Sequence, residues 1–423
     1  RWGWFPGVNA AWRVGEEGFM KRLGWFEDLK VRASYGEMGN QSGIGLYDYI
    51  QLISLSNDYY PFGAGVKGQM ATSGNIISTS RTWETIQTTN VGFDFSTLNN
   101  RLYGSFDYFW KENKNMLIPK TYPSMLGADA PSTNSGHLSI HGWEISLGWR
   151  DQIKDFSYSV RFNISDAKNK VVDRVGSNLF KLGNNETPTG YPLNSYFGYE
   201  FDGIIQNEQE LEAYKSRFSE GGIPGDLSVG DAMYKDLDGD GKLSVLGDGK
   251  EGSGDVKYLG DKNPHYNFGF NLSMAWKGFD LSAFIQGVGR RTMFLEGESR
   301  CPMPEAWYQS AEYWYGKTWT PERTDAQYPA ITLKDKRNYN YYVSTNTKFN
   351  VAYARLKNLQ FGYTIPQTLT SKAGLQKVRV YFSGEDLFEV HNTPNGWDPE
   401  ENSGSITSYP FTRNYSFGIN VVF

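Results

Sequence analysis

The sequence predicts an all-β protein, a transmembrane antiparallel β-barrel to which this chain contributes about eleven strands, half of a 22-stranded barrel. Three observations lead to this fold class. Apolar and polar residues alternate in segments of roughly ten residues along the whole chain. Tight turns and long connections follow these segments in alternation. No apolar run in the 423 residues approaches the roughly 18 residues that a membrane-spanning helix needs.

The alternation is clearest in residues 411–423. Successive side chains of a strand point to opposite faces, so a two-residue period gives one apolar and one polar surface. The apolar positions are Tyr415, Phe417, Ile419, Val421 and Phe423, and the polar positions between them are Asn414, Ser416, Gly418 and Asn420. The segment is therefore expected to be a strand with one face in lipid.

The same period predicts the other strands in chain order. They are expected within residues 1–14, 29–35, 91–96, 102–110, 143–150, 156–165, 268–276, 280–286, 349–365 and 377–382. Phe284 falls on the polar side of its strand, and Arg355 and Lys357 interrupt an apolar stripe. The polar faces carry charges of both signs, from Arg32, Asp94, Asp107, Glu144, Arg150, Arg161 and Arg379. Such a wall either holds a plug through polar contacts or simply wets a wide channel.

The connections predict the topology. Tight turns are expected at 98–100, 151–154 and 277–278, and long loops at 38–82, 119–134, 171–264, 295–346 and 392–408. Outer-membrane barrels place short turns in the periplasm and long loops outside. Strict alternation then requires that the strand-like residues 196–201 form a rim hairpin within the 171–264 loop.

An odd number of strands cannot close a single-chain bacterial barrel, because these barrels have even strand numbers. Open sheet edges in lipid would leave unpaired backbone groups at several kcal/mol each. The chain also opens inside what reads as a strand, at residues 1–6. We therefore expect an amino-terminal part, with the missing half of the barrel, outside this sequence.

The amino-acid composition excludes some classes of protein but does not by itself identify a barrel. The chain has 28 Tyr, 26 Phe, 13 Trp and 47 Gly, and its aromatic fraction of 16% fits interfacial aromatic girdles or a sugar-binding surface. Cys301 is the only cysteine, which excludes a disulfide framework and a cysteine-based zinc site. The net charge of −5 and the scattered Lys and Arg residues argue against nucleic acid as a partner.

An acidic segment in the 171–264 loop suggests a structural Ca²⁺ site. Asp236, Asp238 and Asp240 stand at alternate positions before Gly241, which is the first half of an EF-hand loop, and Ser244 and Asp248 complete the candidate ligands. Hard carboxylate oxygens suit Ca²⁺, and glycine permits the sharp turn. The bidentate Glu expected at the twelfth position is missing, since Gly247 stands there. The alternative interpretation is an acidic, solvated turn.

Aromatic residues in the loops are candidate contacts for a substrate or partner. Residues 304–316 are predicted to form a short helix, since Pro304 stands near its start and Gly316 at its end. Aromatic residues at helical spacing usually pack against the protein, which is the preferred interpretation there. At loop positions exposure is favoured, and exposed aromatics suggest contacts. The candidates are Tyr59, Tyr60, Phe62, Trp307, Trp314, Tyr341 and Tyr342.

No motif for covalent chemistry stands out, so the protein is not expected to be an enzyme. GxSxG, HExxH and P-loop patterns are absent. Residues 247–252 satisfy GxGxxG, but no strand precedes them and no helix follows. His137 and His141 lie four apart on a predicted strand, where such residues converge far less than on a helix.

Several stretches resemble the carboxy-terminal barrel half of SusC/RagA-type TonB-dependent outer-membrane transporters, and the likeness runs nearly end to end. They are residues 4–13 (WFPGVNAAWR), 29–36 (LKVRASYG) with 39–41 (GNQ), 98–108 (LNNRLYGSFDY), 234–242 (YKDLDGDGK), 279–287 (FDLSAFIQG) and 356–366 (LKNLQFGYTIP).

The resemblance implies active import of bulky glycans or peptides across the outer membrane of a Gram-negative cell. It also implies a SusD-type lipoprotein lid, and a plug and TonB box in the missing part that reach the TonB complex. Resembling proteins end in an aromatic assembly signal, here Phe423. Two other functions stay open: a passive porin or protein-export barrel, and a soluble glycan-binding β protein.

Overall fold

The structure is a computed structural model. It describes residues 2–45, 49–56, 70–74, 76–78, 81–119, 125, 132–174, 182–183, 187–246, 254–304, 309–332, 335–401, 404, 409 and 411–423. No helix in these ranges is long and apolar enough to cross a membrane.

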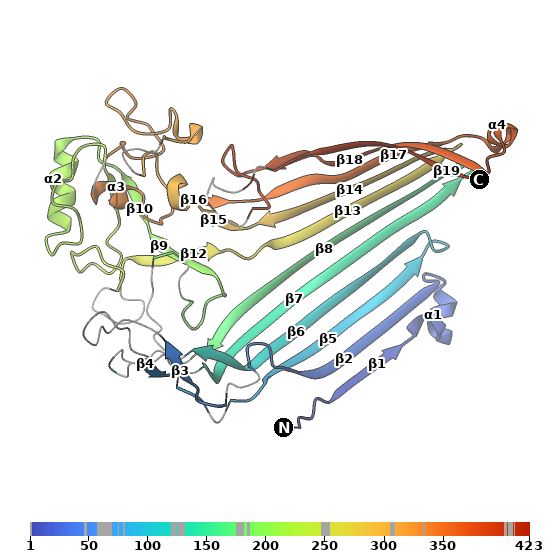
Figure 1. The fold of residues 1–423 in the computed structure, drawn as a ribbon, viewed down its shortest axis with the longest axis horizontal. Helices are drawn as coiled ribbons and strands as arrows, with labels where there is room; N and C mark the ends of the chain where they lie inside the picture. The colour runs from blue at the N-terminus through green and yellow to red at the C-terminus, as the bar shows by residue number, and fades with distance from the viewer. Residues whose placement is uncertain are drawn as a thin grey trace.

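One antiparallel sheet of eleven strands dominates the molecule, and we call it the wall (Figure 1). Its strands are β1 (Gly7–Trp12), β2 (Asp28–Asn40), β5 (Glu84–Thr97), β6 (Leu102–Pro119), β7 (Ser132–Ile153), β8 (Phe156–Asp173), β13 (His265–Trp276), β14 (Phe279–Arg290), β17 (Tyr353–Thr364), β18 (Lys377–His391) and β19 (Asn414–Val422). Their spatial order is their order in the chain, so each strand pairs with its neighbours in sequence. The predicted all-β class and the eleven strands are confirmed.

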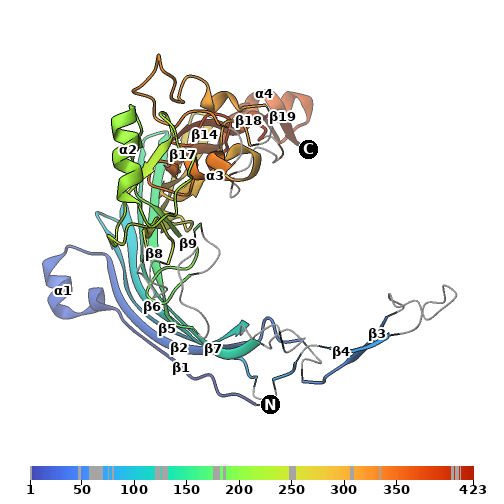
Figure 2. The same ribbon diagram turned by 90° about the vertical axis from the view of Figure 1, so that its left-hand side faces the viewer.

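The wall is an open arc. Figure 2 shows its strands curving around a concave side, with β1 near one free edge and β19 near the other. Neither edge strand has a second partner among the described residues. Phe417 in β19 is 83% exposed, as expected of a strand that lacks a neighbour on one side. This sheet cannot close on itself.

The register keeps the two faces of the wall continuous from strand to strand. Phe162 stands opposite Leu147 and Phe270, whereas its neighbour Arg161 stands opposite Gly148 and Asn271. Ring contacts such as Phe93–Phe106, with centroids 5.7 Å apart, link neighbouring strands on the apolar face. A one-residue slip would reverse both faces, so the alternation fixes the register.

The two ends of the wall differ. At the turn end, β5 and β6 are joined by residues 98–101, where Leu98, Asn99 and Asn100 all have positive φ, between 56° and 59°. At the loop end, the connections are 41–83, 120–131, 174–264, 291–352 and 392–413. Two turn-end connections carry helices: η1 (Val14–Glu16) and α1 (Gly18–Leu23) between β1 and β2, and α4 (Gln367–Thr370) and η5 (Ser371–Ala373) between β17 and β18.

The loop-end connections contain short elements of their own. They are β3 (Ile53–Ser56), β4 (Met70–Ser73), β9 (Ser195–Tyr199), β10 (Phe201–Ile204), α2 (Glu208–Arg217), β11 (Ala232–Tyr234), β12 (Val256–Asp261), β15 (Thr292–Phe294), η3 (Gly297–Ser299), η4 (Glu312–Trp314), α3 (Asp335–Asn340) and β16 (Lys348–Asn350). The strand-like residues 196–201 lie outside the wall, since β9 pairs with β12 and β10 with β11.

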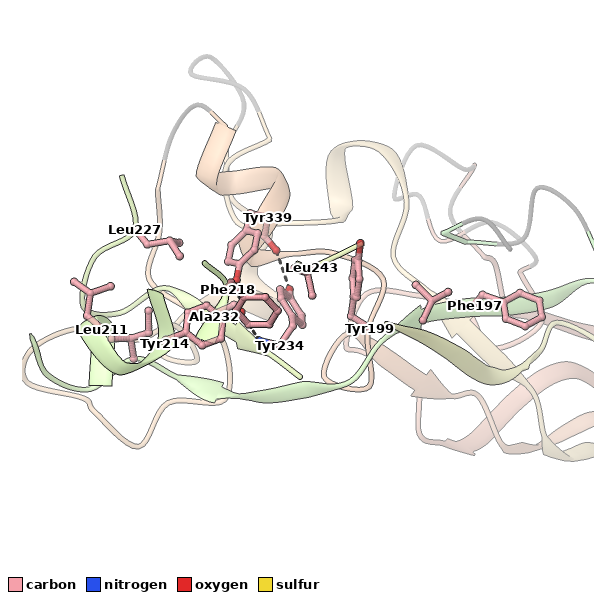
Figure 3. Packing of buried hydrophobic residues seen from close by; sticks show 12 residues of the cluster. Phe197, Tyr199, Leu211, Tyr214, Phe218, Leu227, Ala232, Tyr234, Leu243 and Tyr339 are labelled. Atoms are coloured by element: carbon pink, nitrogen blue, oxygen red, sulfur yellow. Dashed lines mark hydrogen bonds between the residues drawn. The ribbon is translucent and has the colours of Figure 1, made fainter. Parts of the chain in front are cut away.

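The buried core lies in the loops and not in the wall. The connections 174–264 and 291–352 pack together into what we call the loop body, seen beside the loop end of the wall in Figure 1. Its first cluster surrounds Tyr214, Tyr234 and Tyr339 (Figure 3), and its second surrounds Trp314, Tyr328 and Tyr341. A one-layer wall buries little by itself, so the compact core sits where the chain leaves the wall.

The predicted helix over 304–316 is wrong for the part that the structure describes. Residues 309–311 are irregular, and η4 contributes a single 3₁₀ turn. Tyr313 and Trp314 in that turn both enter the second cluster.

Candidate functional site

The loop body places several predicted contact residues in its core. Trp314 is 3% exposed, in agreement with the packing interpretation preferred for it, whereas Tyr341 is 2% exposed, so the exposure favoured for it is wrong. Their rings contact each other edge to face, with centroids 5.5 Å apart, and the Tyr341 hydroxyl donates to the Pro329 carbonyl over 3.1 Å. Both side chains hold the loop body together.

The other predicted contacts have different positions. Tyr342 is half-buried and its ring packs at a tilt against that of Tyr199, with centroids 5.3 Å apart. Phe423 follows the last residue of β19 and is 82% exposed at the turn end. Tyr59, Tyr60, Phe62 and Trp307 lie outside the described residues.

Hydrogen bonds between tyrosines lock the first cluster. The hydroxyls of Tyr214 and Tyr339 are 2.6 Å apart, and the Tyr234 hydroxyl donates to the Tyr339 carbonyl over 2.8 Å (Figure 3). Burial raises the pKa of Tyr214 to about 12. These three rings come from α2, β11 and α3, so the cluster connects the two long connections. The loop body is consequently one preformed unit.

The acidic turn, Asp236–Ser244, brings carboxylates together. Carboxylate oxygens of Asp236, Asp238 and Asp255 lie within 4.8 Å of one another. Asp236 accepts the backbone N–H groups of Gly239 and Gly241 at 2.7 and 3.1 Å, which closes the turn as the glycine spacing predicted.

Asp255 is the acidic-turn residue that sequence reasoning missed. It is fully buried and accepts the backbone N–H groups of Leu237 at 2.6 Å and Ser244 at 2.8 Å. Desolvation raises its pKa, and burial likewise raises the pKa of Asp238. Asp240 is not one of the three clustered carboxylates. Ser244 donates its backbone N–H to Asp255, and Asp248 lies outside the described residues. Three clustered carboxylates, one of them fully buried, are a suitable partial shell for a hard cation.

The polar face of the wall carries ion pairs that cross several strands. Arg32 of β2 contacts both Asp94 of β5 and Asp107 of β6, at 3.1 Å and 2.5 Å. Arg379 of β18 forms an ion pair with Asp280 of β14. Charges that pair within the wall give the concave face a mixed sign, as the sequence predicted.

Glycine makes the Arg379 contact possible. Asp280 and Arg379 are separated by β17, and Gly362 of β17 stands opposite Asp280. A Cβ atom at Gly362 would meet the Arg379 guanidinium at 2.4 Å. The missing side chain therefore leaves the path along which Arg379 crosses a whole strand.

Arg355 anchors the last loop-end connection to the wall. It is 1% exposed, and its guanidinium nitrogens lie 2.8 Å from Asp398 and 2.9 Å from Glu400. Lys357 adds contacts to Asp386 at 2.8 Å and to Glu400 at 3.0 Å. Arg355 and Lys357 interrupt the predicted stripe because the register shifts between Leu356 and Asn358, a β-bulge that turns both cations toward residues 392–413.

His265 joins the loop body to the wall on the other side. This residue, the first of β13, is 5% exposed. Its Nδ1 lies 2.6 Å from Asp166 of β8, and its Nε2 lies 3.2 Å from Asp261 of β12. The imidazole bridges a wall strand and a loop-body strand, so the 174–264 connection is fixed where it re-enters the wall.

An open pocket of about 550 Å³ lies on the polar face at the turn end. Arg150, Ser159 and Ser273 line it and lie in one register row across β7, β8 and β13. Its lining has hydroxyl, amide, guanidinium and carboxylate groups. These residues offer a polar surface for contacts.

Comparisons with known proteins agree with this geometry. No family model matches the chain. TonB-dependent receptor P3 of Formosa agariphila is 31% identical over the whole chain, which covers 42% of that receptor. TonB-dependent receptor SusC of Bacteroides thetaiotaomicron is 25% identical, again over the whole chain and 40% of the receptor. The chain thus spans about two fifths of the length of these relatives.

Solved structures give the same fold. The structure of the RagAB peptide transporter superposes with a TM-score of 0.76 at 21% identity, over 99% of this chain and 43% of the other. A second structure, of the RagAB peptide importer in the open-open state, gives 0.75 over 100% of this chain. Along its whole length, the chain therefore matches the carboxy-terminal barrel half of the SusC/RagA-type TonB-dependent receptors.

Proposed function

We propose that this chain forms the carboxy-terminal half of the barrel of an outer-membrane importer for bulky nutrients in a Gram-negative cell. The observation that carries the proposal is the wall: eleven antiparallel strands with one apolar face, one polar face and two edges that have no partner within the described ranges. Unpaired backbone groups in lipid cost several kcal/mol each, so further strands must close the barrel. An upstream part would supply these strands, the plug and the TonB box through which import is energised.

In this arrangement the loop end faces the outside and the turn end faces the periplasm. The loop body would then stand at the mouth of the channel, where cargo arrives and where a SusD-type lipoprotein would close over it. Exposed side chains on the loop body, such as Tyr315 at 89% and Ile331 at 50%, support a partner surface there. Trp307 in the same loops, and Tyr59, Tyr60 and Phe62 in the connection 41–83, remain proposed contacts.

The cargo is proposed to be a glycan or a peptide. The mixed charges of the concave face give no preference for an anionic or a cationic cargo. One matched structure is named a peptide transporter, which supports peptides, while the abundance of Tyr and Trp supports glycans. Binding and passage need no chemistry from the protein, and the matched relatives are named receptors.

The function is tested by uptake in the native host. Cells that lack the complete receptor are expected to lose growth on one class of polymer, either glycans or peptides, while growth on the corresponding monomers is unchanged. Complementation should restore growth only when TonB is functional. Uptake that continues without TonB would identify a passive porin instead, and a protein that stays soluble without detergent would identify a glycan-binding β protein.

We further propose that the acidic turn holds a structural Ca²⁺ ion between Asp236, Asp238 and Asp255. These three carboxylates are close together, one is fully buried, and two have raised pKa values. Crowded carboxylates repel one another unless a cation or a proton lies between them, and Ca²⁺ takes six to eight oxygen ligands. Backbone carbonyls and water would complete the shell.

Calcium is expected to raise the melting temperature of the loop body, more strongly at neutral pH than at acid pH. The raised pKa values mean that protons stabilise the fold below pH 3.8, the usual pKa, and that this stabilisation is lost as pH rises through the folded-state values. Above the folded-state pKa values the carboxylates are ionised, and bound calcium then stabilises the loop body in place of the protons. Thermal unfolding with calcium and with chelator, across this pH range, measures the effect.

Asp238→Asn is the variant and Asp226→Asn the control for the calcium experiment. Asp226 is exposed, lies in the same connection and is not one of the three clustered carboxylates. The variant should lose the calcium-dependent shift and the control should keep it. A shift of equal size in both proteins, or none in the wild type, would contradict the calcium site and leave a solvated turn.

A further inference from the structure

The connection between β1 and β2 is one of two turn-end connections that carry helices. Where β13 and β14 are joined by the tight turn at Lys277 and Gly278, residues 13–27 instead form η1 and α1. Helix α1 ends at Leu23 and is capped by Gly24, whose φ of 64° is the left-handed conformation that suits glycine at a helix C-terminus. The chain thus inserts a capped helical segment where a tight turn would be enough.

This helical segment stands on the apolar, convex side of the wall. Figure 2 shows α1 outside the arc of the sheet. The ring of Phe26 contacts Phe95 of β5 edge to face, with centroids 6.4 Å apart, and Phe95 is followed on the same face by Phe93 at 6.3 Å. Gly15 is buried, and a Cβ atom there would lie 2.8 Å from the backbone nitrogen of Leu29. Residues 15 and 26 therefore hold the segment close against the wall.

Hydrogen bonds fix the segment in this position. The Trp12 indole donates to Glu17 over 3.0 Å, and Lys21 pairs with Glu16 at 2.7 Å. On the far side, the Asn99 backbone N–H donates to Glu27 over 2.7 Å. A turn with contacts at both ends is rigid enough to present a defined surface.

The surface that α1 presents is apolar and carries one basic residue at its margin. Phe19 is 55%, Leu23 is 49% and Trp25 is 67% exposed. Phe19 and Leu23 are four residues apart and share a helix face, while Arg22 lies about 60° from Phe19 around the axis and Lys21 lies opposite. Arg22 is exposed and has no ion-pair partner among the residues that the structure describes. An apolar environment would stabilise the exposed apolar side chains, and an anion would stabilise the Arg22 guanidinium.

We propose that α1 is an interfacial anchor that lies in the phospholipid headgroup region of the inner leaflet, with Arg22 on a lipid phosphate. The proposal rests on the membrane location in the proposed function. The apolar face of the wall continues directly into the segment through Phe95 and Phe26, so the same lipid covers both. Helices with an apolar face and flanking Lys or Arg bind at this depth, with the apolar side chains roughly 5–10 Å into the headgroup and acyl boundary.

Quenching of a fluorophore by spin-labelled lipids tests the depth of α1. The complete receptor, with any cysteines outside this chain replaced, is labelled at Phe19→Cys and reconstituted into vesicles of phosphatidylcholine and phosphatidylglycerol. Cys301 is 1% exposed, so the unsubstituted protein is expected to stay unlabelled. A spin label near the headgroup should cause roughly twofold more quenching than one deep in the acyl chain, as interfacial depth requires. A second label at Leu23→Cys should behave in the same way.

Two control labels separate this proposal from the function on which it rests. Val91→Cys lies on the apolar face of β5 and should be quenched by the deeper spin label. Asp155→Cys lies in the exposed turn between β7 and β8 and should be quenched by aqueous iodide alone. If position 91 meets lipid while position 19 behaves like position 155, the anchor is overturned and the barrel stands. If neither 19 nor 91 meets lipid, the membrane function itself fails.

Two further outcomes decide what contacts α1. Arg22→Gln should reduce the quenching of the Phe19→Cys label by the headgroup spin label in vesicles of either lipid, because phosphatidylcholine and phosphatidylglycerol both carry the phosphate. Unchanged quenching in Arg22→Gln would overturn the phosphate contact. Oxidation of Phe19→Cys that gives disulfide-linked dimers would show that a second copy covers α1, which would overturn the lipid anchor.

Discussion

Phe162→Arg is expected to stop the barrel from assembling in the membrane. Phe162 lies on the apolar face of β8, six residues from its turn-end start at Phe156, and contacts the row of Leu147 and Phe270. Since a membrane-crossing strand has about 9–11 residues, this position is near the bilayer midplane. Arginine there costs about 2–4 kcal/mol. The loss of heat-modifiable barrel from the outer-membrane fraction measures the effect.

Asn163→Arg is the matched control for Phe162→Arg. Asn163 is the next residue of β8 and stands on the polar face, opposite Ser146 and Gly269. The same side chain placed there should be tolerated, because Arg161 already carries a charge on this face, 3.4 Å from the Tyr103 hydroxyl. If Phe162→Arg assembles normally while Arg161→Phe fails, the two faces have been assigned the wrong way round.

The wall could be predicted from the sequence because its rule is local. Each strand needs a two-residue period to put one face in lipid, and each neighbour repeats it in register. Even the irregularities carried information. Phe284 on the polar side and the pair Arg355 and Lys357 all stand beside one bulge, where the register shifts in both strand pairs of β17. An alternation that fails at one place in two paired strands indicates a bulge.

The loop body could not be predicted in the same way, because its contacts join residues far apart in the chain. Tyr341 stands in a polar loop and looks like a surface aromatic, yet it is buried in the second cluster, whose members run from Met293 to Trp397. Asp255 completes the acidic group from beyond the expected motif. Helix α2 was missed although its signal was present: Asn207 caps the N-H of Glu210 at 2.9 Å, and Glu210 returns to the backbone of Gln206.

Arg355 also makes its contacts with residues far away in the chain, and its loss is expected to affect the loop end strongly. Its guanidinium lies over the ring of Phe411 at 4.1 Å and contacts Asp398 and Glu400 of residues 392–413. Removing one partner of a buried ion pair costs about 3–5 kcal/mol, since the other charge stays buried without compensation. Arg355→Met would leave these carboxylates facing one another.

Arg355→Met is therefore expected to release residues 392–413 from the wall while the wall itself stays assembled. Limited proteolysis should cut this connection in the variant and spare it in the wild type, and the melting temperature should fall. Arg355→Lys should rescue only part of the effect, because an ammonium group cannot span the separate carboxylates as the guanidinium does. Adding Asp398→Asn and Glu400→Gln to Arg355→Met should recover most of the resistance, since the uncompensated charge is then gone. Resistance to protease in Arg355→Met alone would mean that packing of Trp397, which is 6% exposed in the second cluster, holds the connection without the ion pairs.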